Sequence, residues 1–546
     1  MDELKTNVLY YGDNLEILRK YIPDSSVDLI YLDPPFNSKA TYNVLYKEPT
    51  GKPSQAQITA FEDTWQWGLE SERSLQEIAA SPIASAPVKE FMSVLPNFVG
   101  QKTPMRAYLT MMGIRLLELK RVLKDTGSLY LHCDPTASHY LKILLDATFG
   151  TKNFRNEIIW RRTYAGKTIA RNIPSNSDFI LWYTKSNDYL FNPIKKPLSD
   201  EDKAFYKKDD HDGRGPYSTV SMQKVSGPTP GTAYDYKDDS GKIWKCPPKG
   251  WRMIFEKVKA LENDNRLYLG GKTLREKYYL SERVLIGKQV DNLWADIGNM
   301  NRKKNEDLGY ATQKPEALLE RIIEASSNEG DIVLDPFCGC GTAVVAAQRL
   351  NRKWIGIDIT YLAIGLMEWR LKNMVPMPAC KVIGEPEDLA SAVELANKDK
   401  YQFQWWAVHK VGGQPYGDKK KGADTGIDGY LYYMDEKDKI KKAIISVKGG
   451  KTVGVDMIKV LCHVIDVEKS DIGVFISLEK PTKPMLEEAA MKGFYHSPLG
   501  KDYPRIQILT IEEIFQGKSP DIPPWIAPIT KPPPVKKAEG KATKML

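Results

Sequence analysis

Four consecutive residues, Asp33, Pro34, Pro35 and Phe36, stand directly after the apolar run VDLIYL. Such a run predicts a short buried strand. Two consecutive prolines cannot continue the hydrogen bonds of a strand or enter a helix interior, so they fix the chain just beyond the strand end. Ligands of open parallel sheets bind at this end of the strands. The motif therefore predicts a rigid site that presents a carboxylate beside an aromatic ring.

This combination suits the transfer of a methyl group to the exocyclic amino group of a base. The lone pair of such a nitrogen is delocalised into the ring, which makes the nitrogen a poor nucleophile. If the Asp33 carboxylate and the Pro34 carbonyl accept its N–H hydrogens, the lone pair becomes available to an electrophilic methyl group. Phe36 offers a face on which an extruded base can stack. An isolated Asp-Pro-Pro also fits a plain turn, so the interpretation depends on a partner motif.

The partner motif is VLDPFCGCGTAVVAA, which predicts a strand, a glycine turn and a helix. Gly339 and Gly341 allow a sharp turn and a close approach of the backbone to a ligand. Asp358 ends the next strand, where a carboxylate can accept hydrogen bonds from ribose hydroxyls. The loop holds no lysine, which argues against a phosphate cradle of the P-loop kind. A purely structural strand-to-helix turn is the alternative.

Composition permits a nucleic-acid partner without requiring one. The chain has 546 residues and a formal net charge of +8, from 78 basic and 70 acidic residues. Its six cysteines form no Cys-x-x-Cys pair, which argues against a zinc site or a disulfide framework. We expect no signal peptide and no membrane span, because no apolar run reaches roughly eighteen residues. The expected location is cytoplasmic.

The sequence pattern divides the chain into regular and irregular regions. Strands and helices alternate in two regions, which predicts a mostly parallel sheet with helices on both faces. Between them lies an aperiodic, aromatic and charged region that we interpret as a target-recognition insertion. The expected divisions are 1–186 with the Asp-Pro-Pro-Phe motif, 187–305 as the insertion, 306–380 with the glycine loop, 381–400 as a linker, 401–528 as a second compact module, and 529–546 as a disordered tail.

A further pair of charged residues stands out in the C-terminal module. Asp428 follows a glycine-rich turn, and Lys448 lies on the apolar strand AIISVKGG. An unpaired charge on a buried strand is costly, so this lysine indicates a site.

Four separated motifs, LDPPFN, SLYLHCDPTASHYLK, TQKPEALLERII and LDPFCGCGT, resemble the β class of N6-adenine/N4-cytosine DNA methyltransferases. The resemblance covers Tyr10 to Leu371. It implies a class I methyltransferase fold (doubly wound, mostly parallel, with permuted motif order), S-adenosyl-L-methionine as cofactor and double-stranded DNA as partner. Aspartate at position 33 favours adenine over cytosine. The cofactor-binding residues that the resemblance implies are Asp13, Lys314, Pro315, Asp335, Phe337, Gly339, Gly341, Thr342 and Asp358.

The C-terminal module resembles the Mrr-like branch of the PD-(D/E)xK nucleases, a small α/β fold. In that branch, acidic ligands hold Mg²⁺ near a catalytic lysine. Asp428 and Lys448 match the pattern, but Ser446 stands where the fold supplies Glu or Gln, and a hydroxyl is a weaker Mg²⁺ ligand. Gln404 and Asp424 are candidates to compensate. The resemblance thus implies Mg²⁺ at Asp428, with a degenerate domain that only binds DNA or a partner as the alternative.

The leading hypothesis is a site-specific adenine-N6 DNA methyltransferase of a restriction-modification system with a fused nuclease-like domain. One alternative is an orphan methyltransferase whose C-terminal module only binds DNA or another subunit. Others are an N4-cytosine, RNA or protein amino methyltransferase, and a non-catalytic DNA-binding protein. The hypothesis leaves a homodimer open.

Several smaller features have structural interpretations. Cys338 and Cys340 are expected to pack in the glycine turn, and Trp405 and Trp406 to belong to the core of the C-terminal module. His132, at a strand end, is interpreted as structural or as a residue that borders the pocket.

Overall fold

The computed structural model describes residues 4–35, 66–163, 175–298, 313–416, 426–436 and 439–523. Phe36, Asp424 and the expected tail at 529–546 lie outside the described residues. The chain forms two compact units. One is Pro193–Asp291, and the other joins Met1–Asn192 to Asn292–Leu546.

The larger unit is built around a sheet that has nine strands within the described residues. Their spatial order is β13 (Leu293–Trp294), β4 (Phe154–Arg161), β5 (Ser177–Thr184), β3 (Leu123–Cys133), β2 (Val27–Leu32), β14 (Ile332–Asp335), β15 (Lys353–Asp358), β1 (Val8–Tyr11) and β16 (Lys381–Ile383). The pairs from β3 to β16 are all parallel, whereas β5 is antiparallel to both of its neighbours. The expected α/β fold with a mostly parallel sheet is confirmed.

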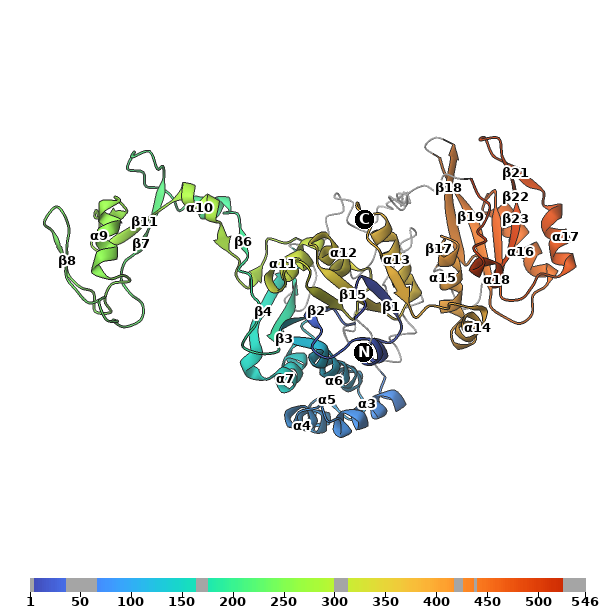
Figure 1. The fold of residues 1–546 in the computed structure, drawn as a ribbon, viewed down its shortest axis with the longest axis horizontal. Coiled ribbons are helices and arrows are strands. Elements are labelled where there is room, and N and C mark those ends of the chain that lie inside the picture. The colour runs from blue at the N-terminus through green and yellow to red at the C-terminus, as the bar shows by residue number, and fades with distance from the viewer. Residues whose placement is uncertain are drawn as a thin grey trace, which may run out of the picture. The chain divides into compact units, whose positions relative to one another are not determined.

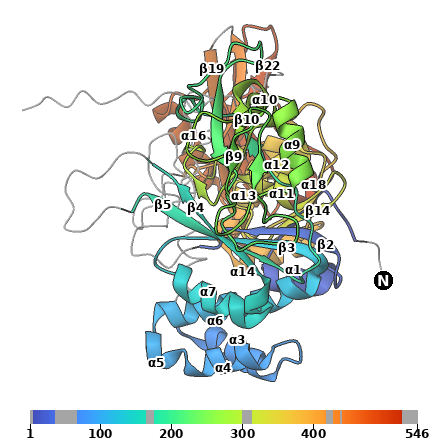
Figure 2. The same ribbon diagram turned by 90° about the vertical axis from the view of Figure 1, so that its left-hand side faces the viewer.

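Helices cover both faces of this sheet (Figures 1 and 2). One face carries α1 (Asn14–Tyr21), α6 (Pro104–Val122) and α7 (Ser138–Phe149), with α3 (Leu69–Ala80), α4 (Ala86–Val94) and α5 (Pro96–Val99) packed beyond them. The other face carries α11 (Glu316–Ser326), α12 (Thr342–Arg349) and α13 (Tyr361–Lys372). Because both faces are covered, the central strands are buried along nearly their whole length, as the apolar run VDLIYL predicts.

Helix α6 illustrates how the sequence sets these elements. The Thr103 side chain accepts a hydrogen bond from the Arg106 backbone N–H, and Pro104 occupies the first turn, where its missing N–H costs nothing. Apolar residues continue around most of the helix, so it is buried between the sheet and the outer helices. Gly113 allows the close approach of Met92 and Ile78.

The unit Pro193–Asp291 has its own small core, made of Met222, Tyr236, Trp244, Trp251, Val258, Leu267 and Leu274. Its elements are β6 (Lys195–Lys196), α8 (Asp200–Lys203), β7 (Tyr217–Ser221), β8 (Tyr236–Lys237), β9 (Ile243–Trp244), α9 (Phe255–Asn263), β10 (Leu267–Tyr268), β11 (Arg275–Tyr279), α10 (Leu280–Ile286) and β12 (Lys288–Gln289). Strands β6 and β12, at its two ends, pair antiparallel.

Asparagines hold the two residues that flank this unit within the larger one. Asn192 donates through Nδ2 to the carbonyls of Glu324 and Ser327, at 3.0 and 3.1 Å. Asn292 donates through Nδ2 to the carbonyl of Glu157 at 2.9 Å. The unit is shorter than the insertion expected at 187–305, because Leu293–Trp294 joins the central sheet as β13.

The C-terminal part of the larger unit has a second sheet (Figure 1). Its order is β17 (Gln414–Pro415), β18 (Gly429–Glu436), β19 (Lys439–Lys448), β20 (Gly473–Ser477) and β23 (Ile506–Thr510). The remaining elements are α14 (Leu389–Lys398), α15 (Lys400–Lys410), α16 (Val455–Val467), α17 (Lys483–Met491), β21 (Phe494–His496), β22 (Asp502–Pro504) and α18 (Ile511–Phe515). Trp405 and Trp406 lie in its core, as expected.

The C-terminal sheet and the central sheet are tied together through α13 and α15. The backbone N–H of Tyr361 donates to Gln402 Oε1 at 3.1 Å, and His409 pairs with Glu368. Part of the segment expected as a linker is also structured, since Lys381–Ile383 forms the edge strand β16. In the described part of the chain, no helix combines the length and the apolar character needed to cross a bilayer.

Candidate active site

The sequence motifs meet at the carboxyl edge of the central sheet. Strands β2 and β14 pair with Ile30 opposite Leu334, and β1 and β15 pair with Tyr11 opposite Asp358. Because these strands are parallel and neighbouring, the residues that follow them emerge at one edge. Asp33 follows β2, Asp335 and Asp358 end β14 and β15, and Asp13 follows β1 by one residue.

Asp33 forms an ion pair with Lys314. The Asp33 side chain is 17% exposed and that of Lys314 is 12% exposed, so the pair lies largely within the protein. Pro34 is buried and Pro35 is partly exposed. Asp33, Pro34 and Pro35 therefore form a fixed end to β2 whose carboxylate still reaches the surface.

The glycine loop is shaped by hydrogen bonds to the two strand-end carboxylates. The N–H of Phe337 donates to Asp335 Oδ1 at 3.0 Å, and the N–H of Gly339 donates to Asp358 Oδ2 at 2.9 Å. Gly341 has a φ of +75° and precedes α12. A β-carbon at this position would lie 2.5 Å from Met367 Cγ, so both conformation and space require glycine.

The two loop cysteines pack within this turn, as expected from the sequence. The Cys338 thiol donates to the carbonyl of Ile357 at 3.1 Å, and Cys340 lies 3.5 Å from the hydroxyl of Thr342. Thr342 is the first residue of α12 and is buried. Burial raises the pKa of both thiols, so neither is a reactive thiolate.

Asp358 is the most heavily bonded of the loop carboxylates. Besides the Gly339 N–H, it accepts from the backbone N–H and the hydroxyl of Thr360, each at 2.9 Å. Desolvation by the surrounding protein nevertheless raises the pKa of Asp358 to about 6. Desolvation also raises the pKa of Asp335. An additional hydrogen-bond donor, such as one from a ligand, would stabilise the ionised form of either carboxylate.

Asp13 supports the site from the β1 side. It caps α1 through the Leu15 N–H at 2.7 Å and forms an ion pair with Arg115 at 2.8 Å. Asn14, the next residue, donates to the carbonyl of Pro336 at the base of the glycine loop, at 2.8 Å. The structure thus links Asp13 to the loop through its neighbour.

Lys314 and Pro315 precede α11, and Pro315 is its N-cap residue. Arg370, on α13, donates to the carbonyl of Cys340 at 2.6 Å and to Glu316 at 2.8 Å. This arginine fixes the loop between two helices. No sequence signal indicated Arg370 or Arg115, because each depends on contacts between distant segments.

A buried hydrogen-bonded chain lies beside Asp33. The Tyr31 hydroxyl lies 2.9 Å from His132 Nδ1, and His132 Nε2 lies 3.2 Å from Asp178 Oδ2. Arg162 Nε lies 3.1 Å from the other oxygen of Asp178. His132 is fully buried, so it does not line an open pocket. Sequence interpretation missed Asp178, the second residue of β5, because no motif surrounds it.

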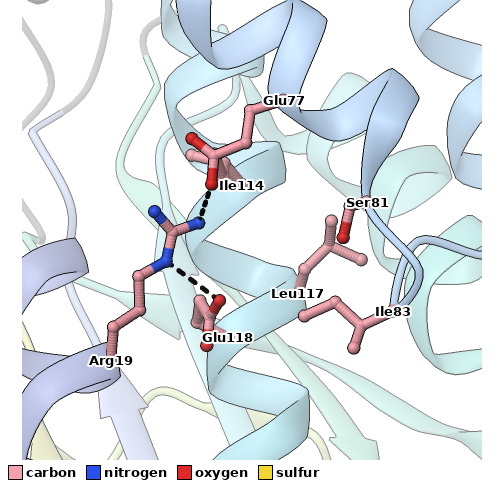
Figure 3. Close-up of a pocket in the computed structure, with 7 residues that line it drawn as sticks. All are labelled: Arg19, Glu77, Ser81, Ile83, Ile114, Leu117 and Glu118. Carbon is pink, nitrogen blue, oxygen red and sulfur yellow. Dashed lines mark hydrogen bonds and ion pairs between the residues drawn. The ribbon is translucent and has the colours of Figure 1, made fainter.

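A small hollow with a cation at its mouth lies elsewhere on the larger unit. Figure 3 shows Arg19 between Glu77 and Glu118, with a distance of 3.1 Å from Arg19 Nε to Glu118 Oε1. Arg19 is near the end of α1. It pairs with both carboxylates of the hollow, and no residue that lines the hollow belongs to the motifs at the carboxyl edge.

In the C-terminal sheet, Asp428 precedes β18 and accepts a hydrogen bond from the Val447 N–H at 2.7 Å. Val447 stands between Ser446, which is buried, and Lys448, which ends β19 and is partly exposed. The structure therefore brings together the three residues that the nuclease resemblance singled out. Within the described residues, no group of three His, Cys, Asp or Glu side chains is arranged to hold a metal ion. Gln404 is half-buried on α15.

An open, mostly parallel α/β sheet with acidic residues and a glycine loop at its carboxyl edge defines an enzyme class that binds nucleotide-like cofactors there. The chain belongs, more particularly, to the DNA methylase family, whose sequence profile matches residues 27–364. The N6/N4 DNA methylase family expected from the four motifs is thereby confirmed.

Two curated proteins and one solved structure are similar to this chain. The type II methyltransferase M.EcaI of Enterobacter cloacae is 34% identical over 264 residues, which are 47% of this chain and 56% of that protein. The StyLTI Mod subunit, of a type III restriction-modification enzyme of Salmonella typhimurium, is 26% identical over 368 residues, 64% of this chain and 50% of that protein. The chain thus spans about half the length of the curated relatives it matches. The crystal structure of the M1.HpyAVI–SAM complex is 15% identical, with a TM-score of 0.29, and the match covers 67% of this chain and all of that one.

Proposed function

We propose that this chain transfers a methyl group from S-adenosyl-L-methionine to the N6 amino group of adenine in double-stranded DNA. The observation that carries the proposal is the placement of Asp33. Its carboxylate ends β2 at the edge where the glycine loop and Asp358 also lie. A hydrogen-bond acceptor for the amino group and a cofactor loop are the two parts that such a transfer needs.

The loop residues fit the cofactor. Gly339 and Gly341 both have positive φ, a conformation that glycine adopts readily, so the loop can turn sharply beside a ligand. Asp358 is a carboxylate with a raised pKa that ribose hydroxyl donors would stabilise in its ionised form. Asp335 and Phe337 border the same turn. When bound, the cofactor supplies an electrophilic methyl group on its sulfonium.

The residues of the chain then activate the base. Asp33 accepts one N–H of the amino group and the Pro34 carbonyl accepts the other, which localises the nitrogen lone pair toward the methyl group. Aspartate rather than serine at position 33 supports adenine; cytosine N4 is the alternative target. The base must leave the helix to reach this edge, and Phe36, beyond the described residues, is the proposed stacking partner.

The unit Pro193–Asp291 is proposed as the target-recognition domain. It is inserted between β5 and β13 and is built of short strands and long connections. Lys237, Lys249 and Lys272 are exposed on it and are available to phosphates.

The C-terminal module is proposed to engage DNA. The proximity of Asp428, Ser446 and Lys448 supports a nuclease-like ancestry and a restriction-modification role. Mg²⁺ bound at Asp428 is the finer hypothesis, but the described donors include one carboxylate and one hydroxyl there, which do not make a complete Mg²⁺ site. We therefore assign no step to a metal.

The test compares wild type with Asp33→Ala and Asp358→Ala. Asp33→Ala is expected to abolish methyl transfer to DNA while calorimetry finds cofactor affinity unchanged, because Asp33 contacts the base. Asp358→Ala is expected to weaken cofactor binding first. Single-molecule sequencing of DNA from cells that express the wild type identifies the base and the site. Methylated cytosine would correct the target, and equal loss of cofactor affinity in both variants would contradict the assigned roles.

A further inference from the structure

Lys314 is the cation in direct contact with Asp33. Its Nζ donates to Asp33 Oδ2, although the two residues are far apart in the sequence. In the part of the chain that the structure describes, no other hydrogen bond to the Asp33 carboxylate is found. One carboxylate oxygen is therefore held by the protein, and Oδ1 is left to accept a hydrogen from outside.

The same ammonium group influences further carboxylates at this edge. The hydrogen bond and charge of His132, followed by the charges of Arg162 and Lys314, lower the pKa of Asp178 against desolvation. Lys314 also opposes the desolvation that raises the pKa of Asp335. Asp178 is 3% exposed and also contacts His132 and Arg162. Lys314 thus lies near Asp33, Asp178 and Asp335, whose negative charges offset the cost of burying its ammonium group.

Hydrogen bonds hold the ends of β2 and β3 next to this ion pair. Leu32 pairs with Leu131, so Asp33 and His132 occupy equivalent positions at the ends of β2 and β3. His132 is held from both ring nitrogens, by Tyr31 and by Asp178. Tyr31 lies on β2, two residues before Asp33, so its hydrogen bond to His132 fixes the end of β2 from which Asp33 projects.

We infer that Lys314 is a positioning residue that acts through Asp33, rather than the cofactor ligand that the sequence motif implies. The inference rests on the proposed methyl transfer and deepens it. The last torsion of an aspartate side chain is broad, so a free carboxylate samples many orientations. Fixing Oδ2 on Lys314 orients Oδ1 toward the base before the base arrives. Such preorganisation matters because a displacement of about 1 Å can cost roughly 100-fold in rate.

The test measures rate and cofactor affinity separately. Lys314→Met is expected to lower the single-turnover rate of methyl transfer about 10- to 100-fold at saturating S-adenosyl-L-methionine, a range taken from the cost of misplaced groups. The dissociation constant of S-adenosyl-L-methionine, measured by calorimetry, is expected to change by less than about twofold. Lys314→Arg keeps the charge and should recover at least about tenfold of the lost rate.

Double variants identify the route of the effect. In an Asp33→Asn background, Lys314→Met should change the residual rate by less than about twofold, because the residue it acts through is already altered. The same four proteins, unfolded in urea, should show coupling between positions 33 and 314, which needs no activity. Weaker cofactor binding with an unchanged rate at saturation would overturn the inference. The inference would also be overturned if Lys314→Met methylated DNA at the same rate as an active wild type. A wild type that methylates no DNA would instead overturn the proposed function.

Discussion

The clearest consequence of the site geometry is a pH dependence of cofactor binding. The pKa of Asp358 is raised to about 6 by desolvation, against the hydrogen bonds from Gly339 and Thr360 that favour the ionised form. If ribose hydroxyls donate to Asp358, as proposed, its ionised form is the better acceptor and binds the cofactor more tightly. As the pH falls through 6, protonation should compete with the cofactor, and affinity should fall.

The size of the effect follows from that pKa. At pH 5 about one molecule in eleven carries ionised Asp358, so the dissociation constant should rise about tenfold between pH 7 and pH 5. This corresponds to about 1.4 kcal/mol, the free energy of one pH unit. Below pH 6 the slope should approach one decade per unit. The window must stay below pH 7, because the α-amino group of the cofactor titrates near 8.

Calorimetry at half-unit steps from pH 5 to pH 7 measures this profile. The pKa of Asp335 is also raised, so this residue could instead cause the dependence of the dissociation constant on pH. Asp358→Asn should bind the cofactor weakly but with no pH dependence, whereas Asp335→Asn should retain the wild-type slope. A flat wild-type profile, or a slope that survives in Asp358→Asn, would refute the role assigned to Asp358.

Three further predictions test other parts of the molecule. Gly341→Ala should lower the free energy of unfolding by about 1–3 kcal/mol, because a β-carbon meets Met367 at a positive φ; urea denaturation measures it, and unchanged stability would contradict the geometry. Exchanging Pro193–Asp291 for the corresponding unit of a relative should change the methylated sequence, and sequencing that finds the original motif would remove the recognition role. Lys448→Ala should abolish any Mg²⁺-dependent cleavage of unmethylated DNA by the wild type; DNA binding without cleavage by either protein would favour the orphan methyltransferase.

The parts of the site that could be predicted from sequence are those that depend on residues adjacent in the chain. Consecutive prolines after an apolar run predict the end of β2, and two glycines before a helix predict the turn that precedes α12. These signals depend only on backbone conformation, so one segment is enough to see them. The mostly parallel character of the sheet could also be predicted, because strands that alternate with helices are joined by the crossovers that parallel pairing needs.

Contacts between distant segments could not be predicted in the same way. The motif containing Lys314 indicates a site but not that its partner is Asp33, and nothing near Asp178 indicates that it holds His132. Both are long-range pairings set by which strands become neighbours. The end of the inserted region could not be predicted from sequence either. Leu293–Trp294 joins the central sheet by pairing with β4, and a strand of two residues is too short to show a periodic pattern.

The paired ends of the inserted unit have a consequence for how such chains diversify. Strands β6 and β12 pair with each other at the two ends of the inserted unit, and Asn192 and Asn292, which flank it, are hydrogen-bonded within the larger unit. The two ends of the inserted segment therefore lie close together. The entropy lost when the ends of an inserted segment are brought together changes only slowly with the length of that segment. The central sheet can therefore stay unchanged in related proteins while the inserted segment is lengthened, shortened or replaced by recombination.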